Sequence, residues 1–281
     1  MLIAAILAST TLLSCVGYAG SQPKFVIIPP SQERVSGVAK ASGITNKNCL
    51  AKCPAGASIA NIVVDHDAIV LSSNRETKFA DWVAYLSKTD YIDGPRRDRK
   101  WAKDPEIDAA HTFIPEDYKD MSTEPFLFDR GHQAPLASFK NHPKWYVVNY
   151  LSNITPQKKY LNRGPWKCLE TAERNLVKKF GEAYVMTGPY YDKKNMIEGP
   201  YIKRITYTVP SGYWKIIAIK EGEEIRAISF SFPQNTPSTT DYCKALVPLA
   251  NIEQSTGLEF FDGKPVFETL ALKKGIGCDA P

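Results

Sequence analysis

Short runs of β-branched and aromatic residues, separated by turn-forming residues, recur along most of the chain after residue 58. Such runs predict β-strands, because branched and aromatic side chains pack well on a pleated surface. The run at 59–71 contains two of them and predicts two strands joined by a turn. Further strands are expected at 80–86, 146–151, 183–187, 202–209, 214–219 and 225–230.

The pattern changes to a helical one over 162–180. Asn162 is a good N-cap residue, and Pro165 is tolerated there because it would fall in the first turn. Asn162, Trp166, Glu170 and Arg174 are spaced by four and would share one stripe of the helix. That stripe is either an ordinary solvated face with a Glu170–Arg174 ion pair or a functional polar face.

The remaining segments carry weaker signals. Four prolines punctuate 91–125, which indicates loops, and the segments 240–249 and 258–267 mix helix and loop signals. No internal repeat, heptad pattern or low-complexity tract is visible in the sequence. The pattern therefore predicts an α+β fold with a central antiparallel β-sheet flanked by helices.

The first residues differ from the rest. Residues 2–13 are apolar or small, a stretch too short to span a bilayer, and Gly17-Tyr18-Ala19 fits a signal-peptidase site. We expect a signal peptide at 1–19, a leader or linker at 20–48 and the functional domain at 49–281. The product would be secreted to the extracellular space. Alternatives are a periplasmic protein, or a lipid anchor on Cys15, because Leu12-Leu13-Ser14-Cys15 resembles a lipobox.

Export also changes how the cysteines are interpreted. Without Cys15, five cysteines remain, and an oxidising compartment favours disulfides over a zinc site. Cys49 and Cys53 can close a small loop, and Cys243 with Cys278 is the natural second pair. Cys168 would then be the free thiol.

Composition and charge narrow the function classes only slightly. Of 281 residues 43% are hydrophobic and 23% charged, which excludes a disordered chain, and no later stretch approaches the ~20 apolar residues of a membrane span. The net charge of +5 suits an anionic partner.

The segment 129–138 carries the clearest chemistry. His132 has the side chain best suited to proton transfer near neutral pH, and Arg130 can clamp a phosphate with two hydrogen bonds. Gly131 between them allows another backbone or a ligand to come close. These residue types point to a site that cleaves phosphodiesters.

This segment is the first of an ordered series of motifs. It is followed by Asn149–Gln157, Leu161-Asn162, Glu170 and Arg174, and it is flanked by 78–85, 101–105, 187–189, 210–215 and 234–237. The series resembles the DNA/RNA non-specific endonuclease family over roughly residues 49–278. The resemblance implies a ββα-metal active site, in which two strands carry the histidine and a helix carries the metal ligand.

The family's roles transfer to matching positions. The resemblance implies that His132 is the general base and that Asn162 is the one direct protein ligand to Mg²⁺, with Mn²⁺ as a substitute. A single neutral ligand is reasonable, because Mg²⁺ keeps several waters. Glu170 matches the carboxylate that orients metal-bound water, and Asn153 matches a polar group that orders the site.

Three cations complete the implied site. Arg130 and Arg174 match cations near the phosphate, and Arg99 matches the arginine that stabilises the transition state. Arg96, Arg97 and Lys100 lie in the same stretch, so a shifted register would select a different cation. Asp129 is expected to orient the arginine or its loop rather than to bind metal.

The resulting hypothesis is a secreted, Mg²⁺-dependent endonuclease that acts on single- and double-stranded DNA and RNA and leaves 5′-phosphate ends. Activity should fall below the pKa of His132, which is ~6.5 when unperturbed. Two alternatives are a non-catalytic nucleic-acid-binding protein on the same fold and a phosphodiesterase for small esters. Some family members form dimers, so a homodimer is one arrangement open to this chain.

Other conspicuous residues have ordinary explanations. His66, His111 and His142 are expected to be structural or surface residues, and the five tryptophans to be core or shelf residues. The basic pairs at 158–159, 178–179 and 203–204 either line a phosphate track or simply aid solubility.

Overall fold

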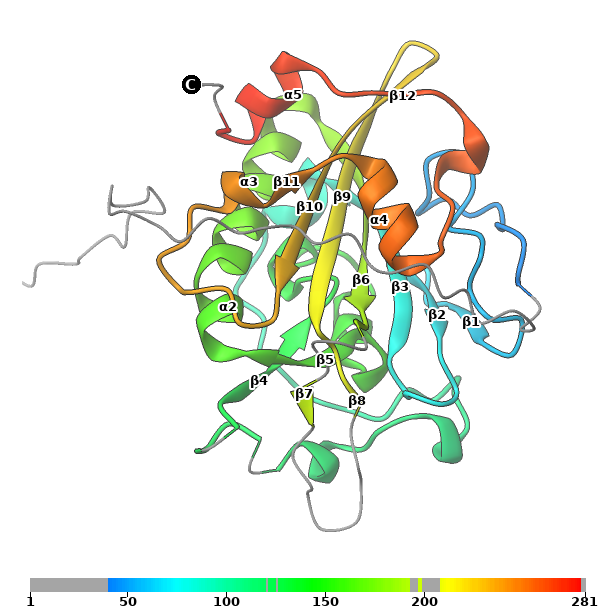
Figure 1. Ribbon diagram of the computed structural model, residues 1–281, viewed down its shortest axis with the longest axis vertical. Helices are drawn as coiled ribbons and strands as arrows, with labels where there is room; N and C mark the ends of the chain where they lie inside the picture. Colours follow the sequence, from blue (N-terminus) through cyan, green and yellow to red (C-terminus); the bar gives the residue numbers. More distant parts are fainter. Residues whose placement is uncertain (1–39, 120, 125, 193–196, 199–207, 279–281) are drawn as a thin grey trace, which may run out of the picture.

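A long, strongly twisted β-sheet runs through the middle of the molecule (Figure 1). The computed structural model describes residues 40–119, 121–124, 126–192, 197–198 and 208–278. In that part of the chain the central sheet has eight strands, in the order β1-β2-β3-β6-β9-β10-β11, with β12 also paired to β10. All its pairings are antiparallel except β10–β12, so the predicted α+β fold with a central antiparallel sheet is confirmed.

The described strands are β1 (Ile62–Asp65), β2 (Val70–Ser73), β3 (Ala80–Lys88), β4 (Phe128–His132), β5 (Ile154–Lys158), β6 (Glu182–Tyr190), β7 (Ile197–Glu198), β8 (Thr208–Val209), β9 (Gly212–Glu221), β10 (Glu224–Pro233), β11 (Leu246–Val247) and β12 (Val266–Phe267). The α-helices are α1 (Thr89–Ile92), α2 (Lys159–Arg163), α3 (Pro165–Phe180), α4 (Leu249–Thr256) and α5 (Leu270–Gly275). The 3₁₀ turns are η1 (Ala109–His111), η2 (Pro115–Tyr118), η3 (Leu136–Ser138), η4 (Trp145–Asn149), η5 (Leu151–Asn153), η6 (Tyr242–Ala245) and η7 (Phe261–Gly263).

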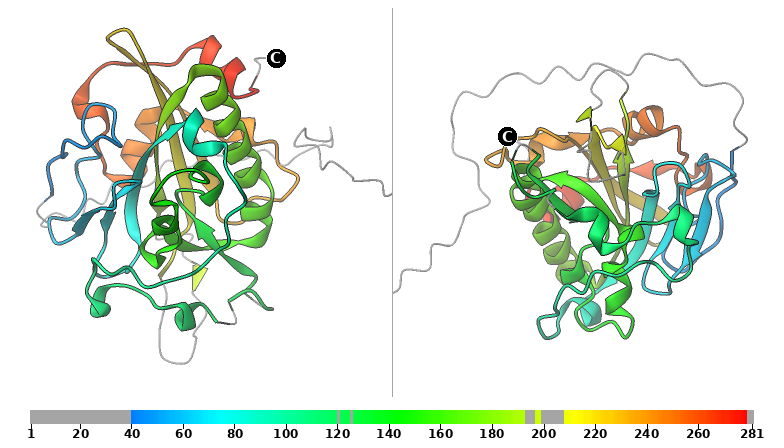
Figure 2. Two further views of the ribbon diagram at one scale, coloured as in Figure 1. Left: turned by 180° about the vertical axis from the view of Figure 1, so that it is seen from behind. Right: turned by 90° about the horizontal axis from the view of Figure 1, so that it is seen from below.

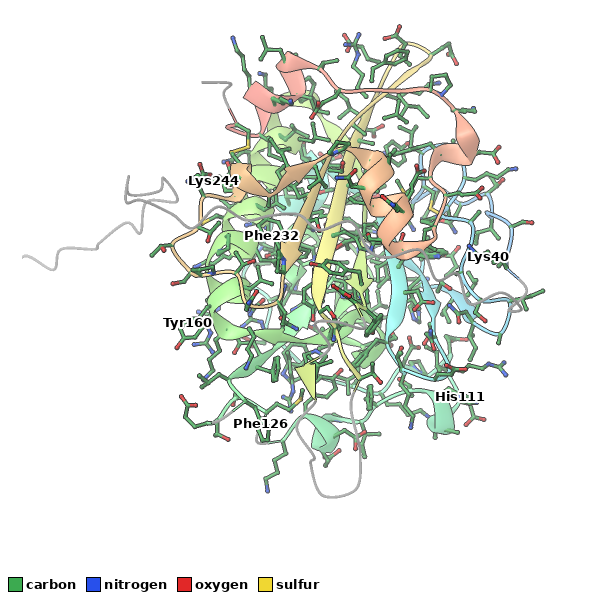
Figure 3. The ribbon with its side chains drawn as sticks, viewed as in Figure 1. Lys40, His111, Phe126, Tyr160, Phe232 and Lys244 are labelled. Atoms are coloured by element: carbon green, nitrogen blue, oxygen red, sulfur yellow. A yellow bond between two sulfur atoms is a disulfide. The ribbon has the colours of Figure 1, made fainter. Side chains whose placement is uncertain are left out.

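Both faces of the central sheet are covered, which explains the nearly continuous apolar strands. Adjacent residues of a strand point to opposite faces, so Ile217 joins the core under α3 while Ile216 joins the core under α4. The ribbon shows α3 on one side of the sheet and α4 on the other (Figures 1 and 2). Interior side chains such as Phe232 are fully buried, whereas Tyr160 lies at the margin and is 58% exposed (Figure 3).

The strand predicted at 146–151 is wrong. The structure has the 3₁₀ turns η4 and η5 there. Asn153 explains the difference, because its side-chain Nδ2 donates to the carbonyl of Val148 at 2.8 Å and to that of Ala134 at 3.0 Å. Side-chain bonds of this kind compete with sheet ladders for the backbone. The strand expected at 202–209 lies mostly outside the described residues, which include only β8 at its end.

The single helix predicted at 162–180 is divided into α2 and α3 at Gly164. A Cβ on Gly164 would lie 2.5 Å from the carbonyl oxygen of Tyr160 and 2.7 Å from Ser238, so a larger residue would collide with both. Pro165 occupies the first position of α3, as expected. Asn162 is not an N-cap, because it lies inside α2 and the cap of α3 is Gly164.

Two disulfides have both partners among the described residues, Cys49–Cys53 and Cys243–Cys278. The prediction of a free Cys168 is wrong, because Cys168 is also disulfide-bonded. The prediction of a free thiol rested on an odd count of cysteines after residue 19; residues 1–39, where a signal peptide and most of a leader were expected, lie outside the described residues. Residues 40–48 already contact the domain; for example, the amide of Leu86 donates to the Asn48 side chain at 3.2 Å.

Candidate active site

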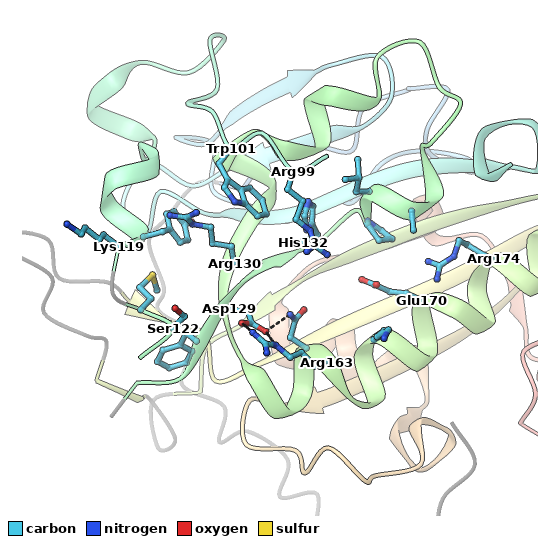
Figure 4. Close-up of a pocket in the computed structure, with 18 residues that line it drawn as sticks. Arg99, Trp101, Lys119, Ser122, Asp129, Arg130, His132, Arg163, Glu170 and Arg174 are labelled. Carbon is cyan, nitrogen blue, oxygen red and sulfur yellow. Dashed lines mark hydrogen bonds and ion pairs between the residues drawn. The ribbon is translucent and has the colours of Figure 1, made fainter. Parts of the chain in front are cut away.

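A cleft of about 780 Å³ opens between β4, α2–α3 and the segments at 99–101, 118–119 and 121–122 (Figure 4). Six of the predicted site residues line it: Arg99, Arg130, His132, Asn162, Glu170 and Arg174. They come from positions up to 75 residues apart in the sequence, and the fold brings them together.

The two-stranded sheet β4–β5 positions the histidine. The strands pair antiparallel, with Gly131 opposite Thr155 and His132 opposite Ile154 at the end of β4. A Cβ on Gly131 would lie 2.6 Å from the Cβ of Gln157, so only glycine allows β5 to approach this closely. The close neighbour that Gly131 accommodates is therefore the partner strand.

Three neighbours surround the His132 imidazole. Its Nε2 lies 3.2 Å from Oδ1 of Asn149, and its ring centroid is 5.1 Å from that of Trp101. Burial lowers the pKa of His132 to about 4; the charge of Arg99 acts in the same direction and the bond to Asn149 opposes it. This pKa lies well below the value of an unperturbed histidine, so the imidazole is neutral at physiological pH.

The carboxylate of Asp129 holds the side-chain amide of Asn162. Its Nδ2 donates to Oδ2 of Asp129 at 2.9 Å, and Arg163 forms two further bonds to the same carboxylate, each of 2.7 Å. Asp129 thus orients an arginine, as predicted, but the arginine is Arg163. The bond to Asp129 engages the amide nitrogen, which leaves the Asn162 oxygen as the group available to a ligand.

Glu170 and Arg174 lie one turn apart on α3 and line the cleft together (Figure 4). Burial raises the pKa of Glu170 to about 7, against the charges of Lys215 and Arg174. Nη1 of Arg174 is buried and has no hydrogen-bond partner among the described residues. A buried cationic N–H without a partner is costly, and an anionic ligand oxygen would satisfy it.

Arg130 is held between two aromatic rings. Its guanidinium lies 5.5 Å from the centroid of Trp101 and 5.6 Å from that of Tyr118, and Nη2 donates to the carbonyl of Pro115 at 2.9 Å. These contacts fix the cation beside His132 in the cleft wall (Figure 4).

The fold places the arginines that precede Trp101 in different surroundings. Arg99 lines the cleft, whereas Arg97 stacks 5.0 Å from the ring of Trp145 and donates to the carbonyl of Lys140 at 2.7 Å. Of these two arginines, only Arg99 reaches the site.

Asn153 is the predicted site residue that does not reach the cleft. It is fully buried, and its side chain binds the backbone of Ala134 in both directions, accepting from the amide at 2.9 Å. It therefore fixes the chain just after His132. Sequence reasoning missed Asn149, although both asparagines stand in the same motif. Nothing in their spacing shows which one faces the histidine.

The assembled groups suit the hydrolysis of a phosphodiester. They offer a neutral imidazole, an amide oxygen, a carboxyl group and guanidinium groups within one cleft. No group of three or more His, Cys, Asp or Glu that could hold a metal occurs in the described ranges. Carbonyl oxygens are ligands that Mg²⁺ accepts.

Comparison with known proteins identifies the family. The family model for DNA/RNA non-specific endonucleases matches residues 47–267. A nuclease of Serratia marcescens is 40% identical over 235 residues, which cover 82% of this chain and 86% of that protein. Human mitochondrial endonuclease G is 30% identical over 206 residues, which cover 69% of this chain and 67% of that protein.

A solved structure supports the same assignment. EndoG in the EndoG/EndoGI complex superimposes with a TM-score of 0.59 and 25% identity, covering 72% of this chain and 86% of that one. The fold is thus the ββα-metal nuclease fold, with β4, β5 and the α2–α3 helices forming its motif. The chain belongs to the DNA/RNA non-specific endonuclease family and is a hydrolytic endonuclease.

Proposed function

We propose that this protein is a secreted, Mg²⁺-dependent nuclease that cuts both DNA and RNA, with His132 as the general base. The observation that carries this proposal is the pairing of His132 with Asn149 in the same cleft as Asn162, whose amide Asp129 holds. An amide oxygen only accepts hydrogen bonds, so Nε2 of His132 is the protonated nitrogen and Nδ1 keeps its lone pair.

His132 then acts as the base through Nδ1. It removes a proton from the water that attacks phosphorus. The bond between phosphorus and the 3′ oxygen breaks, this oxygen takes up a proton from solvent to become a hydroxyl, and the phosphate stays on the 5′ end of the other fragment. Arg99, Arg130 and Arg174 line the cleft and stabilise the negative charge that develops on the phosphate oxygens. Glu170, when ionised, accepts hydrogen bonds from water in the cleft.

The oxygen of Asn162 would hold the metal, because the nitrogen of this amide is bound to Asp129. A metal held there would supply positive charge that stabilises the negative charge developing in the reaction. We expect the enzyme to tolerate any base sequence, because contacts directed at phosphate and sugar carry no base information directly.

The disulfides support secretion, since they persist in oxidising compartments. No helix in the described part of the chain is long and apolar enough to cross a membrane. Mass measurement of the mature N-terminus decides between cleavage after Ala19 and lipidation of Cys15.

Plasmid DNA and an RNA transcript, each with and without Mg²⁺, test the activity. The wild type should cut both polymers only with the metal, and His132→Ala should be inactive. His111→Ala is the matched control, because His111 does not line the cleft. Binding without cutting would instead support the non-catalytic alternative, and cleavage of small esters alone would support the phosphodiesterase.

Asn162→Ala tests the metal ligand. Without the amide oxygen, Mg²⁺-dependent cutting should fall at least about a hundredfold, because supporting residues alone change metal affinity or activity about 10–100-fold. Calorimetric titration of Mg²⁺ should show the same loss. Unchanged activity and Mg²⁺ affinity in this variant would contradict the ligand assignment.

A further inference from the structure

A buried ion pair lies between α3 and the central sheet, behind the cleft. Lys215 of β9 and Glu173 of α3 are both 0% exposed, and Nζ lies 3.1 Å from Oε2. Tyr85 of β3 joins them: its hydroxyl donates to both carboxylate oxygens at 3.0 Å and accepts from Lys215 at 3.1 Å. The Lys215 ammonium also lies 5.1 Å from the ring centroid of Trp166.

Stability alone does not account for this network. Two charges removed from water are usually no more stabilising than apolar residues of the same volume. The face of the sheet that contains Lys215 is packed mainly with apolar side chains, among them Val185 and Ile217, and its other buried polar groups, such as Thr187 opposite Lys215, are uncharged. A charged pair in this position therefore needs a reason beyond filling the core.

The network contacts both sides of the cleft. Glu173 lies one helical turn from Glu170, which lines the cleft from α3. On the other side, Oγ of Ser138 donates to Oε1 of Glu173 at 3.3 Å. Ser138 ends η3, and Leu136 of the same turn lines the cleft a few residues after His132.

We propose that Lys215, Glu173 and Tyr85 form a positioning network that fixes α3 against the segment that follows His132. The network is directional, because hydrogen bonds set the position of the Glu173 carboxylate more tightly than apolar contacts would. It holds Glu170 and Arg174 on one side, and His132 on the other, at a constant separation. This inference rests on the proposed function, because it concerns the geometry of that reaction.

A small displacement would affect turnover more than substrate binding. Reacting groups must be held within about 0.5 Å of their productive arrangement, and a shift of about 1 Å can cost a hundredfold in rate. The polymer, in contrast, binds through several phosphate contacts. The network should therefore be visible in kcat rather than in KM.

The test replaces the whole network by apolar residues of similar size, in the triple variant Lys215→Met/Glu173→Leu/Tyr85→Phe. We expect the full chain to fold with a melting temperature near that of the wild type. On DNA at saturating Mg²⁺, kcat should fall ten- to a hundredfold while KM changes less than twofold. A kcat within twofold of the wild type would overturn the inference.

Ile216→Ala is the matched control. Ile216 is the neighbour of Lys215 on β9 but points into the opposite core. It should lower the melting temperature and leave kcat unchanged at a temperature where the variant is folded. A fall in kcat equal to that of the triple variant would overturn the inference, because any destabilisation of the sheet would then suffice.

Ser138→Ala decides the matter if the triple variant does not fold. It removes only the bond between Glu173 and η3, and it should lower kcat three- to tenfold at constant KM. An unchanged kcat would overturn the inference. If the wild type cuts no nucleic acid, the proposed function and this inference are both refuted. If the wild type cuts nucleic acid and the triple variant and Ser138→Ala have the same kcat, only the inference is refuted.

Discussion

The imidazole of His132 owes its properties to three side chains that differ in kind. Asn149 binds Nε2, Trp101 lies against the ring, and Arg99 contributes a nearby positive charge. The hydrogen bond sets which nitrogen carries the proton, and burial together with the charge keeps the ring neutral. A general base needs both conditions at once.

Replacing Asn149 should therefore reduce turnover. In Asn149→Ala the proton is free to move to Nδ1, and the base is lost in the fraction of molecules where it does. We expect kcat to fall about 5–150-fold, which corresponds to a lost hydrogen bond of ~1–3 kcal/mol, with little change in KM. Nitrogen NMR of the imidazole should show Nε2–H in the wild type. A wild type with Nδ1–H would contradict the assignment.

The lowered pKa of His132 gives a second prediction. Because burial and Arg99 disfavour the imidazolium, the ring should stay neutral down to about pH 4, whereas a free imidazole would be largely protonated at pH 5.5. NMR titration of the ring protons measures this midpoint. The imidazole will not limit activity between pH 5 and 8, so an acid limb in that range would come from another group, such as Glu170.

Arg99→Gln should raise the His132 midpoint, since it removes a charge that lowers the pKa. Arg97→Gln serves as the control, because Arg97 stacks on Trp145 away from the cleft. A midpoint that moves with Arg97 rather than with Arg99 would show that the other register is correct.

At this scale the sequence identified the residue types and most positions, but not the partners. The ordered motifs pointed to His132, Asn162, Glu170 and Arg174 through the family resemblance, and all four line the cleft. Asn149 and Asn153 stand four residues apart in one motif, and only the fold decides that Asn149 faces the histidine while Asn153 binds the backbone. The Asp129–Asn162 bond crosses 33 residues and has no local signal.

At the scale of elements, the break between α2 and α3 has a functional consequence. The helical period predicted one continuous stripe, but Gly164 turns the chain so that Asn162 binds Asp129 of β4. Trp166, the second member of the expected stripe, is 1% exposed and packs in the core. The spacing of four residues was a correct guide to α3 and misleading across Gly164.

Lys167 on the exposed side of α3 is a candidate contact for the polymer. Lys167 is exposed and lines the cleft with Arg174, about 10 Å further along the helix axis. We expect Lys167 to contact a phosphate of the strand other than the cleaved one. In Lys167→Gln, KM should rise several-fold for all sequences, and the slope of log(kcat/KM) against log(salt) should fall by about one.

Lys178→Gln is the control for that measurement. Lys178 lies on the same helix, but its ammonium is 3.4 Å from Asp93 and it does not line the cleft. Equal effects of the two substitutions would mean that only the overall charge of the protein matters.

For the whole molecule, the sequence predicted the class of the fold but not which strands pair with one another. Alternating and apolar runs marked β3, β6, β9 and β10 correctly, because their periodicity is local. The pairing of β3 with β6 spans about a hundred residues, and β4–β5 forms a separate sheet. These arrangements depend on long-range packing, which leaves no trace in a short window of sequence.

The disulfides Cys49–Cys53 and Cys243–Cys278 should differ in their effect on global stability. Cys243–Cys278 bridges 35 residues and ties the C-terminal segment to the core, whereas Cys49–Cys53 bridges four. The loss of loop entropy in the unfolded chain grows with loop length, so Cys243→Ser/Cys278→Ser should cost about 4 kcal/mol and Cys49→Ser/Cys53→Ser about 2 kcal/mol. Denaturant unfolding at 25 °C measures both.

Since none of these cysteines lines the cleft, kcat of the folded variants should stay at the wild-type value. A larger loss of stability from the shorter loop would mean that native packing around Cys49, rather than loop entropy, sets the contribution.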